Sequence, residues 1–150
     1  MMLPTNILVP TDFSETAEKA LDYAVVLAAK LDARIHLLHV IGIPALGVPE
    51  LGVAMTSSMI GTLVADAQVA LDQLVARRRD KVPFGPTLQR TGDARDMILQ
   101  AAKEVGADLI VIGTHGRRGL SRMLLGSVTD AIVRTAPCPV LTVGVRAVMS

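Results

Sequence analysis

Short apolar runs alternate along the chain with longer segments in which apolar residues recur every third or fourth position. Uninterrupted apolar runs are typical of strands that are covered on both faces, as in a parallel sheet. Each run therefore predicts one strand. The predicted strands cover residues 6–10, 34–41, 86–91, 108–113 and 140–145, and the third of these runs is the weakest.

The segments between the strands have the apolar periodicity of amphipathic helices. The predicted helices have their apolar stripes in residues 17–31, 57–79, 93–105 and 127–134. The three arginines at 77–79 suit the negative end of the second helix, and Gly106 suits a C-terminal cap after the third. The first helix has two candidate N-caps, Asp12 with Glu15 in a capping box, or Ser14 alone. The choice decides whether the Asp12 carboxylate is available to a ligand.

Strands that alternate with helices at this spacing predict βαβ crossovers and a parallel sheet with helices on both faces. The length of 150 residues matches one compact domain, and no internal repeat or linker divides the chain. The segment 42–56 is rich in glycine and proline, which predicts a loop that we expect to act as a mobile cover. We therefore predict one α/β domain over residues 1–150, with an open five-stranded sheet.

Composition narrows the class of protein further. Hydrophobic residues make up 51% of the chain and charged residues 19%, which excludes intrinsic disorder. The net charge is +1 and the aromatic share is 2%, which argues against a nucleic-acid partner. The single cysteine, Cys138, cannot form an internal disulfide, and we expect an inert, packed thiol. No export signal is visible, and prolines interrupt the least charged stretch, 42–65. We expect a soluble cytoplasmic protein without a membrane partner.

Candidate chemistry lies where two of the strands end, because ligands of open parallel sheets bind beyond the carboxyl ends of the strands. Pro10, Thr11 and Asp12 stand at the end of the first strand, and a glycine-rich segment begins at Gly113 at the end of the fourth. Glycines let backbone N–H groups approach a phosphate, and the helix that opens at Gly126 attracts anions to its positive end. The alternatives are that these glycines only form turns and that Asp12 only caps a helix.

Other polar residues suggest no chemistry of their own. His36 and His39 lie three apart on one strand, so they point to opposite faces, and we expect them to pack rather than to bind one metal ion. No nucleophile stands beside an evident base, and no lysine follows the glycines as in a P-loop.

The spacing Gly113-x-x-Gly116, then nine residues, then Gly126-Ser127 resembles the ATP-binding signature of the universal stress protein family. The opening NILVPTDFSE at 6–15, the strand HLLHVI at 36–41 and the closing CPVLTV at 138–143 resemble the same family. The resemblance covers essentially the whole chain. It implies a Rossmann-like fold, similar to adenine nucleotide alpha hydrolases, with the strand order 3-2-1-4-5.

The resemblance also implies a role for each residue of the site. Asp12 would bind the ribose hydroxyls. The residues that line the adenine and ribose side would be Pro10, Thr11, Val40 and Ile112. The residues that bind the phosphates, mainly through backbone N–H groups, would be Gly113, Gly116, Gly126, Ser127 and Val128. Arg117 is the best-placed arginine for phosphate oxygens, with a solvated loop position as the alternative.

The implied function is an ATP-binding protein of the stress response that acts as a nucleotide-dependent conformational or assembly switch, with Mg²⁺ or Mn²⁺ on the phosphates. No general base is evident, so we expect at most slow ATP hydrolysis. The alternative is a dimeric interaction module of the same fold with a vestigial nucleotide site, and a third interpretation is an adenylating or nucleotidyl-transfer enzyme. We expect a homodimer through the apolar edge strand of Val140, Leu141, Val143 and Val145.

Overall fold

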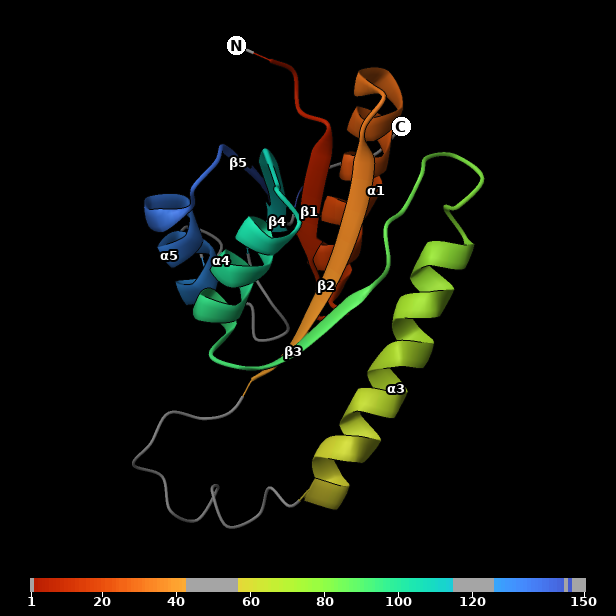
Figure 1. Ribbon diagram of the computed structural model, residues 1–150, viewed down its shortest axis with the longest axis vertical. Helices are drawn as coiled ribbons and strands as arrows, with labels where there is room; N and C mark the ends of the chain where they lie inside the picture. Colours follow the sequence, from red (N-terminus) through yellow and green to blue (C-terminus); the bar gives the residue numbers. More distant parts are fainter. Residues whose placement is uncertain (1, 43–56, 115–125, 145, 147–150) are drawn as a thin grey trace.

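Five parallel strands form one sheet in the order β3-β2-β1-β4-β5 (Figure 1). The computed structural model describes residues 2–42, 57–114, 126–144 and 146. The strands are β1 (Asn6–Pro10), β2 (Arg34–Gly42), β3 (Leu88–Gly92), β4 (Leu109–Gly113) and β5 (Val140–Val143). The helices are α1 (Glu15–Leu31), α3 (Ser57–Ala76), α4 (Ala94–Glu104) and α5 (Ser127–Thr135). The predicted α/β class and strand order are confirmed.

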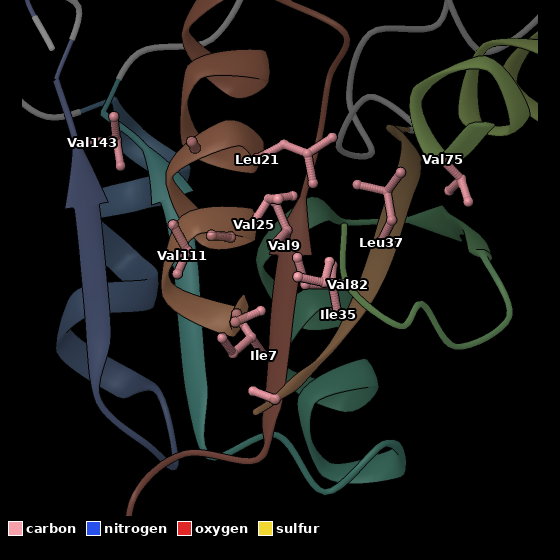
Figure 2. Close-up of a cluster of buried hydrophobic side chains, with 14 of the residues drawn as sticks. Ile7, Val9, Leu21, Val25, Ile35, Leu37, Val75, Val82, Val111 and Val143 are labelled. Atoms are coloured by element: carbon pink, nitrogen blue, oxygen red, sulfur yellow. The ribbon is translucent and has the colours of Figure 1, made fainter. Parts of the chain in front are cut away.

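Helices cover both faces of the sheet, and neighbouring residues of a strand point to opposite faces. On one face, Ile7 and Val9 of β1 pack with residues of α1 and α3 in the larger cluster (Figure 2). On the other face, Leu8 packs with Ile98 of α4 and Ile132 of α5. Because side chains of both orientations are buried, the strands are continuous apolar runs rather than alternating ones.

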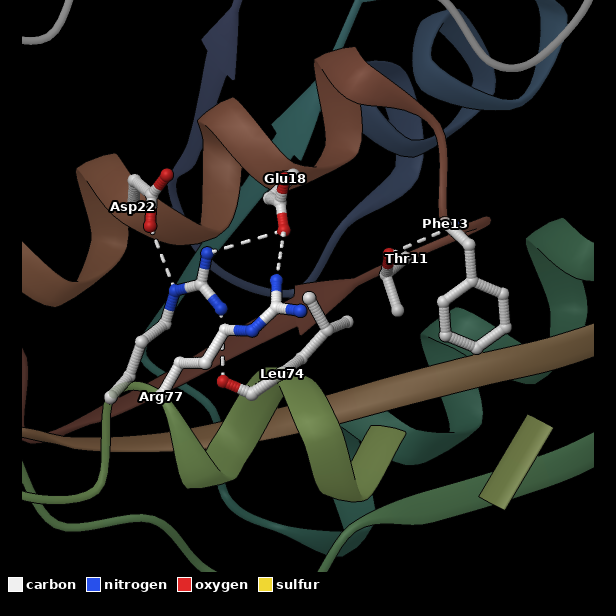
Figure 3. A network of polar contacts seen from close by, with 7 residues as sticks. Thr11, Phe13, Glu18, Asp22, Leu74 and Arg77 are labelled. Carbon is white, nitrogen blue, oxygen red and sulfur yellow. Dashed lines mark hydrogen bonds and ion pairs between the residues drawn. The ribbon is translucent and has the colours of Figure 1, made fainter. Parts of the chain in front are cut away.

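The second predicted helix ends three residues earlier than its arginines suggest. α3 ends at Ala76, and Arg78 lies in the turn that follows, where its N–H donates to the Val75 carbonyl at 2.9 Å. The Arg78 side chain is buried, and its Nε donates to Asp22 Oδ1 of α1 at 2.7 Å. Figure 3 shows Asp22 and Glu18 of α1 pointing towards the arginines after α3. The ion pairs with α1 are made from this turn rather than from a last helical turn.

β2 and β4 differ from their predicted bounds by one residue, and β3 and β5 differ by two at one end. β3 begins at Leu88 rather than at residue 86, since Pro86 has no N–H to donate to a neighbouring strand. β5 ends at Val143, and Val145 lies outside the described residues. Both strands lie at the edges of the sheet.

α3 departs from the expectation about membrane-spanning segments. In the part of the chain that the structure describes, it is the one helix that is long and apolar enough to cross a membrane, judged by length and composition alone. The least charged stretch, 42–65, overlaps only the first half of this helix, and 17% of its apolar window is buried. α3 packs on the sheet through Ala67, Leu71 and Val75. The absence of a membrane partner stays a prediction.

Candidate functional site

The carboxyl ends of β1 and β4 lie side by side in the middle of the sheet. The two strands pair in parallel, with Ile7 opposite Leu109 and Leu8 opposite Ile110. The segment after β1 and the segment after β4 therefore leave the sheet at the same edge, as expected of a ligand site in this topology.

The turn after β1 settles which residue caps α1. Ser14 is the N-cap, and its Oγ accepts a hydrogen bond from Ala17 N at 3.1 Å. Asp12 lies outside the helix, and its Oδ1 accepts from Ser14 N at 3.0 Å. The capping box with Glu15 is therefore wrong, because Ser14, two residues after Asp12, directly precedes the helix and caps it with its own hydroxyl. The Asp12 carboxylate is half-buried and oriented by the backbone of the turn.

Thr11 connects this turn to β2. Its N–H donates to Leu38 O at 2.8 Å, which extends the contact of β1 with β2 by one residue. Its hydroxyl Oγ1 accepts from Phe13 N at 3.0 Å. Thr11 is 6% exposed, so its side chain shapes the turn from inside.

His39 also contacts the turn, a role that the sequence analysis missed. Its Nδ1 lies 2.8 Å from Thr11 O, and its ring lies 4.5 Å from the Phe13 ring, tilted by 35°. His36 lies on the other face of the sheet, 3.0 Å from Asn6 Oδ1, so the prediction that the two histidines do not share a site is confirmed. Burial, aided by the charge of Arg34, lowers the pKa of His36. The position of His39 near the carboxyl end of β2, beside β1, was the available signal.

Gly113 ends β4 against α1. A Cβ at this position would lie 2.9 Å from Thr16 Cγ2 and 3.2 Å from Thr16 O. The Gly113 carbonyl accepts from Thr129 Oγ1 of α5 at 2.7 Å. Close packing of strand and helix is thus a sufficient reason for glycine here, whatever it contributes to phosphate binding.

The amino end of α5 faces the same edge of the sheet. Its N-cap is Gly126, whose N–H donates to the Thr114 carbonyl just after β4. No side chain among the described residues caps this end, so the first backbone N–H groups of the helix are not occupied by a cap. Ser127 is exposed, whereas the Val128 side chain packs in the core, so only the backbone of Val128 can reach a ligand.

The remaining predicted site residues fall into two groups. Pro10 and Ile112 are buried at the ends of β1 and β4, and Val40 is half-buried on the α4 side of β2. Gly116 and Arg117 lie outside the described residues. The structure therefore gathers the described candidates at the carboxyl edge, from β1, β2, β4 and α5.

A cavity of about 250 Å³ lies nearby, between α1 and α3. Its lining includes Thr11, Phe13, Glu18, Leu74 and Arg77, five of the six residues labelled in Figure 3. Among the predicted nucleotide-binding residues that the structure describes, only Thr11 lines this cavity. The cavity is thus next to the predicted site rather than identical with it.

The described residues offer no group of three or more His, Cys, Asp or Glu side chains that could bind a metal ion. A divalent ion at this site would need most of its ligands from a bound phosphate and water, as Mg²⁺ commonly has.

Comparison with known proteins supports the fold and the motifs. The model of the universal stress protein family matches residues 4–144. Universal stress protein MJ0531 of Methanocaldococcus jannaschii is 33% identical over 140 residues, which cover 92% of this chain and 81% of that protein. The structure of universal stress protein UspA from Lactobacillus plantarum is 31% identical, with a TM-score of 0.75 over 93% of this chain and 97% of that one. The structure of MJ0577, also from M. jannaschii, is 29% identical, with a TM-score of 0.82 over 96% and 98%.

Two further structures of similar fold contain nucleotides. The universal stress protein from Archaeoglobus fulgidus was solved in complex with dAMP, and covers 95% of this chain and 99% of its own with a TM-score of 0.64. A universal stress protein was solved in complex with cAMP, with a TM-score of 0.63 over 94% and 97%. Both are 24% identical to this chain, which shows the shared fold. On the family model and the relatives at 30% identity or more, this chain belongs to the universal stress protein family.

Proposed function

We propose that the protein binds ATP across the carboxyl ends of β1 and β4 and acts in the cytoplasm, in the stress response, as a nucleotide-dependent conformational or assembly switch. The observation that carries the proposal is the amino end of α5. Gly126 donates its N–H to Thr114 just after β4, so the N–H groups of α5, which have no side-chain cap, follow the strand that pairs with β1, and β1 leads into Asp12. Anionic phosphate and polar ribose would each meet a suitable group there.

The phosphate end of the proposed site is built from backbone. The N–H groups of Ser127 and Val128 and the exposed Ser127 hydroxyl are the donors offered by α5. Gly113, which has no side chain, would let a phosphate come close to the backbone at the end of β4. The signature assigns Gly116 to the same phosphates, and Arg117, which follows it directly, would pair with their oxygens. Mg²⁺ or Mn²⁺ would bind to the phosphate oxygens and neutralise part of their charge.

The sugar and base end is built from the turn after β1. Asp12 would accept hydrogen bonds from the ribose hydroxyls, because a carboxylate already oriented by Ser14 N can still accept others. Pro10, Thr11, Val40 and Ile112 would line the adenine and ribose side. The complexes of family members with dAMP and cAMP support adenine nucleotides as the ligand class.

Titration calorimetry tests the binding proposal directly. Protein stripped of nucleotide is titrated with ATP, ADP and AMP, with and without Mg²⁺. We expect micromolar ATP binding that depends on both ends of the site. Asp12→Ala should weaken nucleosides and nucleotides alike, whereas Gly126→Val should weaken ATP most. The Gly126 backbone has φ −60° and ψ 153°, which valine adopts without strain, so this variant should fold.

Matched controls lie on α3, away from the site. Asp66→Ala removes an exposed carboxylate, and Gly61→Val adds the same side chain at a position with no atom within 4 Å. Both should bind ATP as the wild type does. Folded wild-type protein that binds none of the three nucleotides would refute the proposal.

A second candidate function, a dimeric interaction module, is favoured by β5. This strand lies at the edge of the sheet, and its first two residues, Val140 and Leu141, are apolar and half-buried. An unpaired edge can pair with a second copy of the chain. Sedimentation with and without ATP tests both functions, since a switch predicts a nucleotide-dependent change and a module predicts a constant dimer. A 15.8 kDa species alone would refute dimerisation. Release of AMP and pyrophosphate would instead indicate an adenylating enzyme.

A further inference from the structure

His39 is linked to the proposed nucleotide site through the backbone of the turn after β1. β2 lies beside β1, with Leu38 opposite Pro10, so the next residue, His39, comes level with Thr11. The His39 Nδ1 atom lies 2.8 Å from the Thr11 carbonyl oxygen. A backbone carbonyl can only accept, so Nδ1 carries the proton and donates. This contact fixes the tautomer of the neutral ring, with the proton on Nδ1 and not on Nε2.

Both backbone groups of Thr11, its N–H and its carbonyl, are therefore hydrogen-bonded to β2. Its N–H donates to Leu38 O at 2.8 Å, and its carbonyl accepts from His39. The residue before Asp12 therefore has little freedom to rotate.

The residue after Asp12 is held by the same histidine. Phe13 has φ 65°, the left-handed region, where a bulky side chain is disfavoured. Two contacts are available to maintain this conformation, the hydrogen bond from Phe13 N to Thr11 Oγ1 at 3.0 Å and the packing of its ring on His39 at 4.5 Å. Strained backbone persists where the surroundings over-determine it, and it often does so at ligand sites.

Asp12 lies between these two residues that His39 contacts. Its own side chain is oriented by the next N–H in the turn, Ser14 N to Oδ1 at 3.0 Å. A change at His39 would therefore move the Asp12 carboxylate but not the backbone N–H groups of α5 that are proposed to bind the phosphates.

We propose that His39 is a positioning residue that fixes the turn Thr11-Asp12-Phe13, so that the Asp12 carboxylate meets the ribose of an adenine nucleoside. The inference rests on the proposed function, and it predicts selectivity. His39 acts on the nucleoside end of the ligand, and the phosphate end is independent of it.

Paired ligands and paired variants test this inference. The affinities of adenosine and of inorganic tripolyphosphate are measured by competition with a fluorescent ATP analogue. His39→Leu removes the donor and keeps an apolar side chain of moderate size, whereas His39→Asn keeps an N–H close to the position of Nδ1. We expect His39→Leu to weaken adenosine by about tenfold, the scale of one hydrogen bond and its geometry. The affinity of tripolyphosphate should stay within about twofold. His39→Asn keeps the donor but loses the ring that packs on Phe13, so it should bind adenosine more tightly than His39→Leu does.

Two further measurements test the inference if His39→Leu does not fold. His39→Gln also lacks the ring and places its amide beyond the Nδ1 position, so it should weaken adenosine binding more than His39→Asn does. Nitrogen NMR of the wild-type imidazole without ligand should show the proton of the neutral His39 ring on Nδ1.

The outcomes separate this inference from the proposed function. Wild-type protein that binds neither adenosine nor ATP overturns the proposed function and the inference with it. Wild-type binding together with unchanged adenosine affinity in His39→Leu overturns the inference alone. Equal losses of adenosine and tripolyphosphate, or a neutral ring protonated on Nε2, also overturn it, because His39 would then be a general packing residue or would not donate to Thr11.

Discussion

Replacing Gly113 by alanine should destabilise the protein by crowding one residue of α1, Thr16. The added Cβ would lie 2.9 Å from Thr16 Cγ2, 3.2 Å from Thr16 O and 3.3 Å from Thr16 C. Real Cβ atoms essentially never approach a neighbour within 3.0 Å. β4 cannot easily move away from α1, because the Gly113 carbonyl accepts a hydrogen bond from Thr129 and Gly113 pairs with Val143 of β5. The strain must therefore be taken up by the packing of α1 on β4.

The magnitude follows from the cost of overpacking a well-packed core, which is about 1–3 kcal/mol. We expect Gly113→Ala to lower the free energy of unfolding by about 2 kcal/mol, or the Tm by about 4–8 °C for a chain of this length. Thr16→Ser removes the Cγ2 methyl and should cost about 1 kcal/mol alone. In the double variant the shortest clash is gone, so the two losses should fall short of additivity by about 1 kcal/mol.

Urea unfolding of the wild type, both single variants and the double variant measures this coupling. Gly61→Ala is the control, because it adds the same methyl to a helix position with no atom within 4 Å, and it should stabilise by about 0.5–1 kcal/mol. A Gly113→Ala variant as stable as the wild type would refute the reasoning. So would strictly additive losses in the double variant, since the clash would then not involve the Thr16 methyl.

Three further predictions concern single positions. Phe13→Gly and Phe13→Ala both remove the ring, but glycine relieves the strain of φ 65°, so it should be more stable than alanine by about 1 kcal/mol in urea unfolding; the reverse order would show that the backbone is unstrained. Burial raises the pKa of Asp108, but hydrogen bonds from Thr5 and Asn6 outweigh it and leave the pKa below its ordinary 3.8. The stabilisation by the Asp108 carboxylate is therefore present above about pH 4 and is lost as the pH falls through the lowered pKa of the folded state. Asp108→Asn should have a smaller free energy of unfolding than the wild type at pH 7, and should lose less of it between pH 5 and pH 2. Parallel pH profiles of the two free energies would contradict this. Burial, aided by the Asp108 carboxylate, raises the pKa of the Cys138 thiol, so alkylation at pH 8 should be at least about tenfold slower in folded than in unfolded protein, and equal rates would show an accessible thiolate.

Much of the fold could be predicted from local pattern. Apolar runs indicate strands covered on both faces, and the observed core confirms this, with Ile7 on one side of β1 and Leu8 on the other. Gly106 follows α4 with φ 64°, as its position in the sequence predicts, and Asp93, predicted as the first residue of the helix, is its N-cap and accepts a hydrogen bond from Asp96 N. These features depend on residues a few positions apart, so short-range periodicity and capping chemistry determine them. The strand order came from resemblance to a family rather than from any such pattern.

The tertiary structure alone decided which distant residues meet. Gly113 contacts Thr16, Arg78 pairs with Asp22, and His39 donates to Thr11, and none of these pairs is marked by spacing along the chain. The end of α3 was predicted too late because the helix dipole favours arginines in a last helical turn. Their carboxylate partners lie on α1, which the local sequence does not reveal. Periodicity records which face of an element is buried. The partner of each side chain depends on how the crossovers place the elements in space. This arrangement brings His39 of β2 against the turn that holds Asp12.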